Sequence, residues 1–244
     1  MNRQQQIVEA FVSLADTFDR TVDPLVLVDR LISHCVNLAG ADAASVTLVT
    51  ARGALRTLSV SDDRADLAEV FQLQTVEGPC HDCWQSWEPV DAADLPAFRE
   101  RWPRFVPSAL AAGFHSAYAL PVRVHGQNVG TLNLLLAPPR AAREDLHLAQ
   151  AFAEVAGIAI MQWRADPARP EDILTHTQAV ISAKASLETA KGMLAAAGGL
   201  SAAEAAALLR EYSRLTGRRP TETAQDLIRR TLDPEAVLAA AERP

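Results

Sequence analysis

The sequence predicts two folding units: an α+β domain built on an antiparallel sheet and, after it, an all-α bundle of three helices. In the first part, strand-like segments come in two pairs, separated by one long helix-containing stretch and bracketed by helices, which is the order expected of an α+β domain. From residue 171 onward only helical patterns occur, and alanine, the residue of highest helix propensity, is frequent there. Between the two parts, Pro167 and Pro170 interrupt helical patterns on both sides and mark the boundary.

The elements of the first part follow from the period of its apolar residues. Helical spacing places Leu25, Val28 and Leu31 on one face of a helix, whereas alternation of apolar and polar residues indicates strands. We predict helices over 4–18, 25–38 and 142–163, strands over 44–50, 54–60, 116–124 and 128–136, and an irregular, proline-punctuated stretch over 62–114. Helices are expected on one face of this sheet, and the long stretch is expected to roof a ligand pocket on the other.

The second part predicts three helices with defined ends. We expect the first over about 171–197, where Gly198-Gly199 stops it. Ser201 and Glu204 form a capping box that opens the second helix, which ends near Gly217. Pro220 suits the first turn of a third helix, which continues to about residue 231.

The first of these helices carries a heptad pattern over three repeats. Apolar residues recur every seven positions with alanines between them, at Ile173, Val180, Leu187 and Leu194 and at Ala183, Ala190 and Ala197. This is the a/d spacing of a coiled-coil seam. Together with the long helix over 142–163, the seam predicts a homodimer.

Composition excludes several classes of protein. No stretch approaches the ~20 consecutive apolar residues of a membrane span, and the polar start lacks the apolar core of a signal peptide. Three cysteines are an odd count, unlike a disulfide-stapled secreted domain. We therefore predict a cytoplasmic protein with no membrane partner. The sequence contains no Walker loop, no Gly-x-Ser-x-Gly elbow and no His-Glu-x-x-His motif, so we also predict that the protein is not an enzyme.

Bulk charge does not predict nucleic-acid binding. The net charge of the chain is −7, and residues 171–244 hold nine Lys and Arg against ten Asp and Glu. A domain that binds nucleic acid is usually clearly basic. Any such function must therefore rest on how the basic residues cluster.

Basic residues do cluster in pairs along the three C-terminal helices. Two flank the heptad seam, two share a face of the second helix and two lie in the connection to the third: Lys184 and Lys191, Arg210 and Arg214, Arg218 and Arg219. Cationic groups on rigid helices can contact phosphates, and Arg can also stack on splayed RNA bases. The alternative is a solvated surface with local ion pairs, because Glu188 is four residues after Lys184 and three before Lys191.

Three motifs occur together within residues 179–232: Leu187-Glu188-Thr189-Ala190-Lys191-Gly192-Met193-Leu194, Gly199-Leu200-Ser201-Ala202-Ala203-Glu204-Ala205 and Leu208-Leu209-Arg210-Glu211-Tyr212-Ser213. In sequence and spacing they resemble the ANTAR domain of bacterial antitermination regulators. The resemblance implies a three-helix bundle that binds paired RNA stem-loops and prevents transcription termination. It also implies that Lys191, Arg210, Arg218 and Arg219 contact RNA.

A second constellation lies in the long stretch of the first part. Cys80 and Cys83 have C-x-x-C spacing and flank His81. They can form a redox pair or contribute to a metal or haem site, for which His115 and His125 are the only distant ligands we consider plausible. The alternative is that both are small buried residues at the start of a helix after the Gly78-Pro79 turn. The tryptophans Trp84, Trp87, Trp102 and Trp163 are candidates for a pocket or an interface, although large aromatics more often lie in a core.

Five short motifs occur along residues 24–163: Gly78-Pro79-Cys80, Arg101-Trp102-Pro103, Gly113-Phe114-His115-Ser116, Leu120-Pro121-Val122 and Gly130-Thr131-Leu132-Asn133-Leu134. Together they resemble the GAF domain of actinobacterial GAF–ANTAR regulators. The resemblance implies a PAS-like antiparallel sheet with a small-molecule pocket. GAF domains differ widely in their ligands, so family membership does not identify the signal.

Together these observations predict a signal-responsive antiterminator that acts on terminator hairpins under the control of a GAF sensor. The predicted parts are an N-terminal helix (1–23), a GAF sensor domain (24–165), a linker (166–170), an ANTAR RNA-binding domain (171–234) and a C-terminal tail (235–244). We expect RNA with tandem stem-loops and a second copy of the chain as partners, no metal and no cofactor beyond an unidentified small-molecule GAF ligand. The alternative function is a ligand- or redox-sensing interaction module whose C-terminal helices serve only dimerisation.

Overall fold

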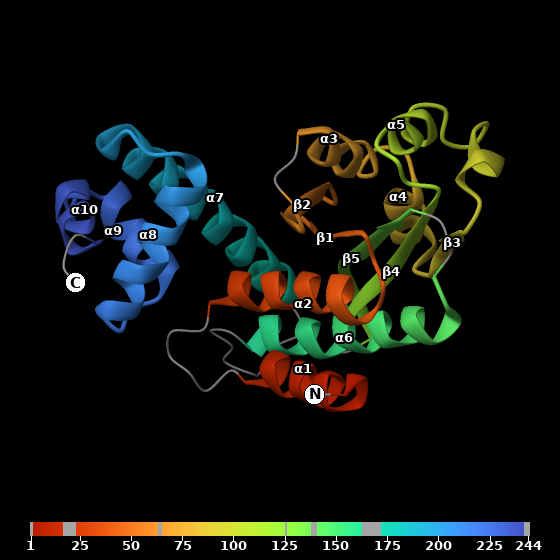
Figure 1. Cartoon of the computed structure of the whole chain (residues 1–244), viewed down its shortest axis with the longest axis horizontal. Coiled ribbons are helices and arrows are strands. Elements are labelled where there is room, and N and C mark those ends of the chain that lie inside the picture. Colours follow the sequence, from red (N-terminus) through yellow and green to blue (C-terminus); the bar gives the residue numbers. More distant parts are fainter. Residues whose placement is uncertain are drawn as a thin grey trace. The chain divides into compact units, whose positions relative to one another are not determined.

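The computed structural model describes residues 2–16, 23–62, 65–124, 126–137, 141–162 and 172–241 and divides into two compact units (Figure 1). The N-terminal unit holds Met1–Asp16 and Pro24–Gln178, and the C-terminal unit holds Thr17–Asp23 and Ala179–Pro244. The predicted linker (166–170) and Trp163 lie outside the described residues. Each unit has its own hydrophobic core.

The N-terminal unit is an α+β domain, as predicted. Its helices are α1 (Arg3–Ala15), α2 (Pro24–Leu38), α3 (Ala65–Leu73), α4 (Pro79–Ser86), the 3-10 helix η1 (Leu95–Phe98), α5 (Phe105–Ala111) and α6 (Arg143–Gln162). Its strands are β1 (Ala43–Val49), β2 (Leu55–Val60), β3 (Val90–Ala92), β4 (Ser116–Val124) and β5 (Gln127–Leu136). The helix α7 (Asp172–Gly198) starts in this unit and continues into the next.

The strands form one antiparallel sheet in the order β2-β1-β5-β4-β3. In its centre, Ser45 of β1 lies opposite Asn133 of β5, and Thr47 lies opposite Thr131. The backbones of β1 and β5 come close at Gly130, where a Cβ atom would be 2.1 Å from the carbonyl oxygen of Thr47. Glycine is therefore required at this position for the two central strands to pair.

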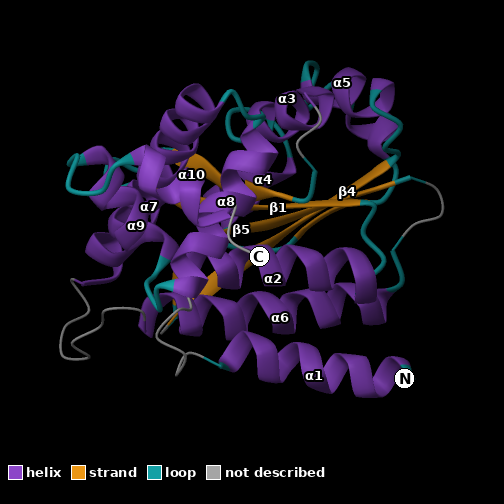
Figure 2. Ribbon diagram, turned by 60° about the vertical axis from the view of Figure 1, so that its left-hand side comes forward, coloured by secondary structure: helices purple, strands orange, loops and turns teal. Residues whose placement is uncertain are grey.

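Helices cover both faces of the sheet. Figure 2 shows α1, α6 and α2 stacked on one side of the strands, and α3, α4 and α5 on the other. Because both faces are covered, every residue of β1 is buried. On the α3–α5 face, the core includes Phe71, Trp102 and Phe105, which pack against Ala43 and Leu135 of the central strands.

The C-terminal unit is a helical bundle in which a fourth helix follows the three predicted ones. Its helices are α7, α8 (Ala202–Leu215), α9 (Pro220–Ile228) and α10 (Pro234–Ala241). The segment 235–244, predicted as a tail, thus contains most of α10, and Val237 is fully buried in the bundle core. The predicted capping box is confirmed: Glu204 N–H donates to Ser201 Oγ at 3.2 Å and Ser201 N–H donates to Glu204 Oε2 at 2.8 Å.

Most residues of the heptad seam of α7 are buried within a single chain. Ala190 and Leu194 are fully buried among residues of α8, α9 and α10, and Leu187 packs against the same core. Val180 and Ala183 are also buried, whereas the side chain of Ile173 lies outside the described residues. Pairing two copies of α7 through Ala190 and Leu194 would require the bundle to open.

Among the described residues, no single helix is both long and apolar enough to cross a membrane. Only the bent pair Thr177–Gly198 and Ala202–Leu215 meets that limit, by length and composition.

Candidate nucleic-acid interface and sensor site

The segment around the C-x-x-C motif is the start of α4, held against the sheet. Gly78 has φ of +142°, a conformation that favours glycine, and Pro79 occupies the first turn of the helix. Cys80 and Cys83 are three residues apart and hence on one helical face, and both are fully buried. The interpretation of these cysteines as buried residues at a helix start therefore fits the structure.

Beneath α4, the sheet presents a row of polar side chains where apolar ones are usual. Ser45 and Thr47 of β1 and Thr131 and Asn133 of β5 alternate onto the α3–α5 face and are all buried. We call these four residues, together with Cys80, the polar patch. The Nδ2 atom of Asn133 donates to Ser45 Oγ and to Thr47 Oγ1, at 3.2 Å each, and Cys80 Sγ lies 3.1 Å from Thr131 Oγ1. The patch contains no charged group.

Both cysteines of the motif are held as neutral thiols. Burial raises the pKa of Cys80 to about 11, although hydrogen bonds with Thr131, Thr47 and Asn133 act in the opposite direction. Burial also raises the pKa of Cys83 to about 12, with the nearby Cys80 adding to the shift. The three cysteines are free, including Cys35 of α2. Because thiolate is the reactive form, this environment disfavours redox chemistry at the motif.

Several buried polar atoms near the polar patch have no hydrogen-bond partner. Asn133 Oδ1 is one, and both amide atoms of Gln74 are others. Gln74 is only 1% exposed and lies beside Gly78, since a Cβ at Gly78 would be 3.3 Å from its Cα. Unpaired buried polar atoms are rare in folded proteins, so these amide atoms distinguish this part of the unit from an ordinary apolar core.

The motif around Gly78 is locked to the Arg101-Trp102-Pro103 motif. Glu77 Oε1 accepts hydrogen bonds from the backbone N–H groups of Arg104 (2.5 Å) and Phe105 (3.0 Å) at the start of α5. Asp82 Oδ2 accepts one from Trp102 Nε1 at 3.0 Å and pairs with Arg101 Nε at 2.7 Å. Sequence reasoning did not assign roles to Glu77 and Asp82, and the available signal was only their place beside the Gly78-Pro79-Cys80 motif.

The tryptophans divide between core and surface. Trp102 is buried and stacks on Phe98, with ring centroids 4.7 Å apart. Trp84 and Trp87 stack on each other at 5.9 Å, and Trp87 is 43% exposed. The core interpretation is therefore confirmed for Trp102, whereas Trp84 and Trp87 form an aromatic pair whose outer member is exposed.

No group of three or more His, Cys, Asp or Glu side chains among the described residues is arranged to hold a metal ion. His115 Nδ1 lies 3.3 Å from the carbonyl oxygen of Gly113, and His125 lies outside the described residues.

In the C-terminal unit, α7 presents Lys184 and Lys191 as one charged triplet with Glu188. The Nζ atom of Lys184 lies 2.7 Å from Glu188 Oε1, and that of Lys191 lies 2.7 Å from Glu188 Oε2. Partial burial raises the pKa of Glu188, but the hydrogen bonds from the two lysines outweigh this and the net pKa is lowered. The carboxylate is therefore charged at neutral pH, and the triplet carries a net charge of one positive unit.

Arg210 and Arg214 lie on the exposed side of α8, one turn apart. Arg214 pairs with Glu211 of the same helix, with its Nη2 atom 2.5 Å from Glu211 Oε1 and its Nε atom 2.9 Å from Oε2. Arg210 makes no ion pair with an acidic side chain of the described residues. Of the predicted RNA contacts on this helix, Arg210 is therefore the one whose charge is not offset locally.

The connection between α8 and α9 is rigid and carries Arg218 and Arg219. Ser213 Oγ donates to Thr223 Oγ1 at 2.9 Å, and Arg218 N–H donates to the carbonyl oxygen of Ser213 at 2.9 Å. The guanidinium of Arg218 pairs with Asp226, and Arg219 stands at the N-cap of α9. The six basic residues that we predicted to contact RNA thus lie in three local pairs. That all six face the same surface stays a prediction.

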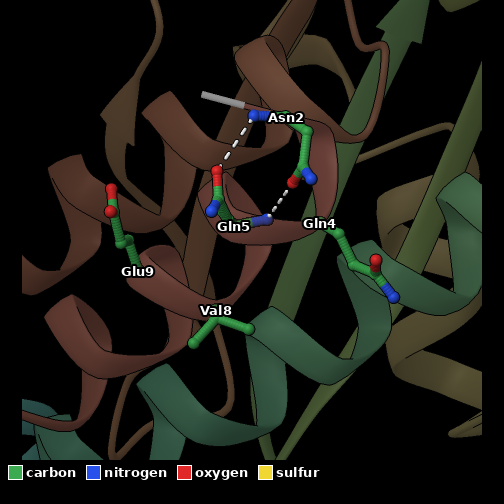
Figure 3. Close-up of a pocket in the computed structure, with 5 residues that line it drawn as sticks. All are labelled: Asn2, Gln4, Gln5, Val8 and Glu9. Atoms are coloured by element: carbon green, nitrogen blue, oxygen red, sulfur yellow. Dashed lines mark hydrogen bonds between the residues drawn. The ribbon is translucent and has the colours of Figure 1, made fainter.

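The N-terminal unit also has a surface hollow. It runs along the start of α1 and is lined by Asn2, Gln4, Gln5, Val8 and Glu9 (Figure 3). Asn2 and Gln5 are already paired in the capping box of α1, with Gln5 N–H donating to Asn2 Oδ1 at 2.8 Å. The hollow contains none of the predicted site residues.

Comparison with protein families finds two successive domains in the chain. Residues 21–161, more than half of the chain, match the family described as GAF domain. Residues 175–228 match the family described as ANTAR domain. No curated protein sequence is similar enough to count as a match.

Among solved structures, one supports the fold of the N-terminal unit. The GAF domain of a phosphoenolpyruvate-protein phosphotransferase from Acinetobacter is 12% identical, matches over 74% of this chain and 98% of its own, and has a TM-score of 0.50. Two others are the GAF domain of the Coxiella burnetii phosphotransferase (15%, 64% and 93%, TM-score 0.48) and free methionine-R-sulfoxide reductase from Neisseria meningitidis (14%, 72% and 90%, TM-score 0.49). The first supports a GAF fold, and these low identities carry nothing about ligand or activity.

Proposed function

The chain belongs to the GAF domain family and also carries an ANTAR domain, and from these two premises we propose that it is a signal-responsive antiterminator acting on terminator hairpins. A GAF domain followed by an ANTAR domain joins a sensor to an RNA-binding output, and both domains are regulatory. The observation that carries the proposal is the ANTAR domain itself, which indicates RNA binding.

The exposed basic groups support a phosphate-binding role for the bundle. Arg210 makes no ion pair among the described residues and projects from a helix that is fixed by its capping box and by the buried Leu209. Arg218 and Arg219 are held by a hydrogen-bonded connection. Cationic groups on such a frame lose little freedom when they bind phosphate.

The same proposal places the small-molecule signal at the polar patch. The patch faces α4, and the unpaired amide atoms of Gln74 and Asn133 are free to bind a guest. Because no charged side chain belongs to the patch, the expected ligand is uncharged and rich in hydrogen-bonding groups. Cys80 fills the space above Thr131, so binding would displace α4 from the sheet. Cys80 and Cys83 then act in ligand sensing and not through a disulfide.

A binding experiment tests the RNA-binding proposal. The full-length protein is titrated into a labelled RNA of two tandem stem-loops at a series of salt concentrations, and Arg210→Ala and Lys191→Ala are compared with the wild type. Each variant should bind more weakly and show a salt slope shallower by about 0.7–0.9, since one phosphate contact is lost.

Arg56→Ala is the matched control, because it removes the same charge from an exposed position of β2 in the N-terminal unit. It should leave both affinity and slope unchanged. Equal weakening by all three substitutions would mean that binding reflects only the total charge of the protein.

The alternative function, an interaction module that does not bind RNA, is favoured by one observation. Three of the predicted RNA contacts in α7 and α8 and one in the α8–α9 connection are already paired with acidic side chains: Lys184, Lys191, Arg214 and Arg218. Absence of RNA binding at low salt, by the wild type and with or without cellular extract as a source of signal, would favour this second function.

We also propose a homodimer, because two bundles are needed to hold two stem-loops at once. Since the α7 seam is largely buried within one chain, the dimer must use another surface. Sedimentation equilibrium that finds only monomer at micromolar concentrations, alone and with the tandem stem-loop RNA, would contradict it.

A further inference from the structure

The geometry of α7 assigns a role to Glu188. Its carboxylate lies between two lysines that are seven residues apart, and each of its oxygen atoms holds one of them at 2.7 Å. The three side chains are partly exposed, at 34% for Lys184, 47% for Glu188 and 23% for Lys191. A dissolved molecule can therefore reach all of them.

A carboxylate and a phosphate compete for the same partner. Both are oxyanions that accept charge-assisted hydrogen bonds from an ammonium group. A phosphate that binds Lys184 or Lys191 must displace an oxygen of Glu188 or share the lysine with it, at the cost of repulsion between like charges. Exposed ion pairs are weak, so displacement is feasible, but it weakens every phosphate contact made at these lysines.

The competition also depends on how many lysines are engaged. A ligand that binds only one lysine leaves Glu188 paired with the other and still repels its charge. Lys184 and Lys191 are about 10 Å apart along the helix axis, at 1.5 Å per residue. A ligand with a phosphate at each lysine displaces the Glu188 carboxylate once and gains two phosphate–lysine contacts. Such a ligand therefore gains more binding free energy from phosphate contacts, for each carboxylate displaced, than a ligand that binds one lysine.

We infer that Glu188 is a specificity-determining residue of the RNA interface, an internal competitor that suppresses binding of RNAs that do not engage Lys184 and Lys191 together. The inference rests on the proposed function, since it needs these lysines to face RNA. Glu188 also joins its neighbours at the i,i+3 and i,i+4 spacings that stabilise helices. A purely helix-stabilising role predicts no change in RNA selectivity, which separates the two roles.

The test compares Glu188→Gln with the wild type in the full-length protein. Glutamine keeps the size and helix propensity but removes the charge, and the exposed position tolerates it. Two labelled probes are used: an RNA of two tandem stem-loops and an unrelated RNA duplex of the same length. Glu188→Gln should bind both more tightly, with a gain of up to about fivefold on the duplex and a smaller gain on the stem-loops, so that selectivity falls. The salt slope should steepen by up to one phosphate equivalent.

Two controls make the outcome specific. Glu235→Gln removes the same charge from an exposed position in the first turn of α10 and should change neither affinity. In a Lys184→Gln, Lys191→Gln background, Glu188→Gln should lose its effect, because the competitor has nothing left to compete for.

Two results would overturn the inference. If the wild type binds the probes but Glu188→Gln behaves like Glu235→Gln, or binds more weakly than the wild type, the inference fails and the proposed function stands. If neither the wild type nor Glu188→Gln binds either probe at low salt, both fail together.

Discussion

The environment of Cys80 decides what this residue can do. A cysteine at the start of a helix is often activated, because the helix dipole lowers the pKa of the thiol. Here the opposite holds, since burial raises the pKa to about 11. Through its hydrogen bond with Thr131, Cys80 Sγ joins the polar side chains of the sheet beneath α4. Its chemistry is that of a weak hydrogen-bonding group.

This environment predicts slow alkylation. At pH 8, about one Cys80 thiol in a thousand is ionised, and both Cys80 and Cys83 are sealed from solvent. Iodoacetamide should therefore label the native protein far more slowly than the urea-unfolded protein, as followed by intact mass spectrometry. Peptide mapping that finds Cys80 alkylated within minutes, or a native Cys80–Cys83 disulfide, would contradict the prediction and restore redox sensing.

Single residues also show what could be inferred from sequence and what could not. The prediction of helix-start cysteines followed from the Gly78-Pro79 turn, a local signal. The pairing of Lys184 and Lys191 with Glu188 followed from i,i+3 and i,i+4 spacing, another local signal, and is confirmed. Glu77 accepts its hydrogen bonds from Arg104 and Phe105, and Asp82 accepts one from Trp102, so the bonded positions are 20 to 28 residues apart and no periodic pattern in the sequence indicates them.

At the scale of elements, prediction succeeded where a pattern was long. The four longer strands and the helices α1, α2, α6 and α7 have many turns or alternations, and their predicted bounds are close to the observed ones. The strand β3 was missed because Val90–Ala92 is only three residues long and lies at the sheet edge, paired with β4 alone. Its strand conformation comes from this tertiary pairing.

The helix α10 was missed for a different reason. Asp233-Pro234 is a sound stop signal for α9, but Pro234 also occupies the first turn of a new helix, where proline is favoured. What fixes α10 is the burial of Val237 and the approach of Leu238 to Gly198, whose Cβ would be 2.7 Å from Leu238 Cδ2. Such contacts depend on the assembled bundle.

The two glycines of α7 allow a test with opposite expected signs. Gly192 lies in the exposed part of the helix, and a Cβ there would meet nothing within 4 Å. Gly192→Ala should therefore raise the free energy of unfolding by up to about 1 kcal/mol through helix propensity. Gly198→Ala should lower it, because the added Cβ would collide with Leu238. Urea unfolding followed by far-UV circular dichroism measures both.

A stabilising Gly192→Ala would also bear on function. A glycine that costs stability and contacts nothing in the fold is expected where the backbone of another molecule comes close. If Gly192→Ala is destabilising instead, the fold itself needs glycine at this position.

At the scale of the whole molecule, the sequence predicted two units from a proline-rich break, and the structure has two units with separate cores. The seam of α7 shows the limit of this approach. A heptad pattern reports that one face of a helix is buried, but it does not report whether the partner is another chain or the same chain. In the structure, Ala190 and Leu194 face their own bundle.

Because the two units have separate cores, we expect a destabilising substitution in one unit to leave the unfolding of the other unchanged. All four tryptophans belong to the sequence before Gln178, so tryptophan emission reports the N-terminal unit, whereas far-UV circular dichroism also reports the C-terminal helices. Leu194→Ala empties a fully buried position of the bundle and should cost about 2–5 kcal/mol there. The circular dichroism of this variant should fall at lower urea concentration while its tryptophan transition stays in place. Leu67→Ala, the same truncation in the N-terminal core, should shift the tryptophan transition instead.

If Leu194→Ala moves both transitions together, the units unfold as one cooperative block, and a change in the sensor would reach the RNA-binding helices through shared stability.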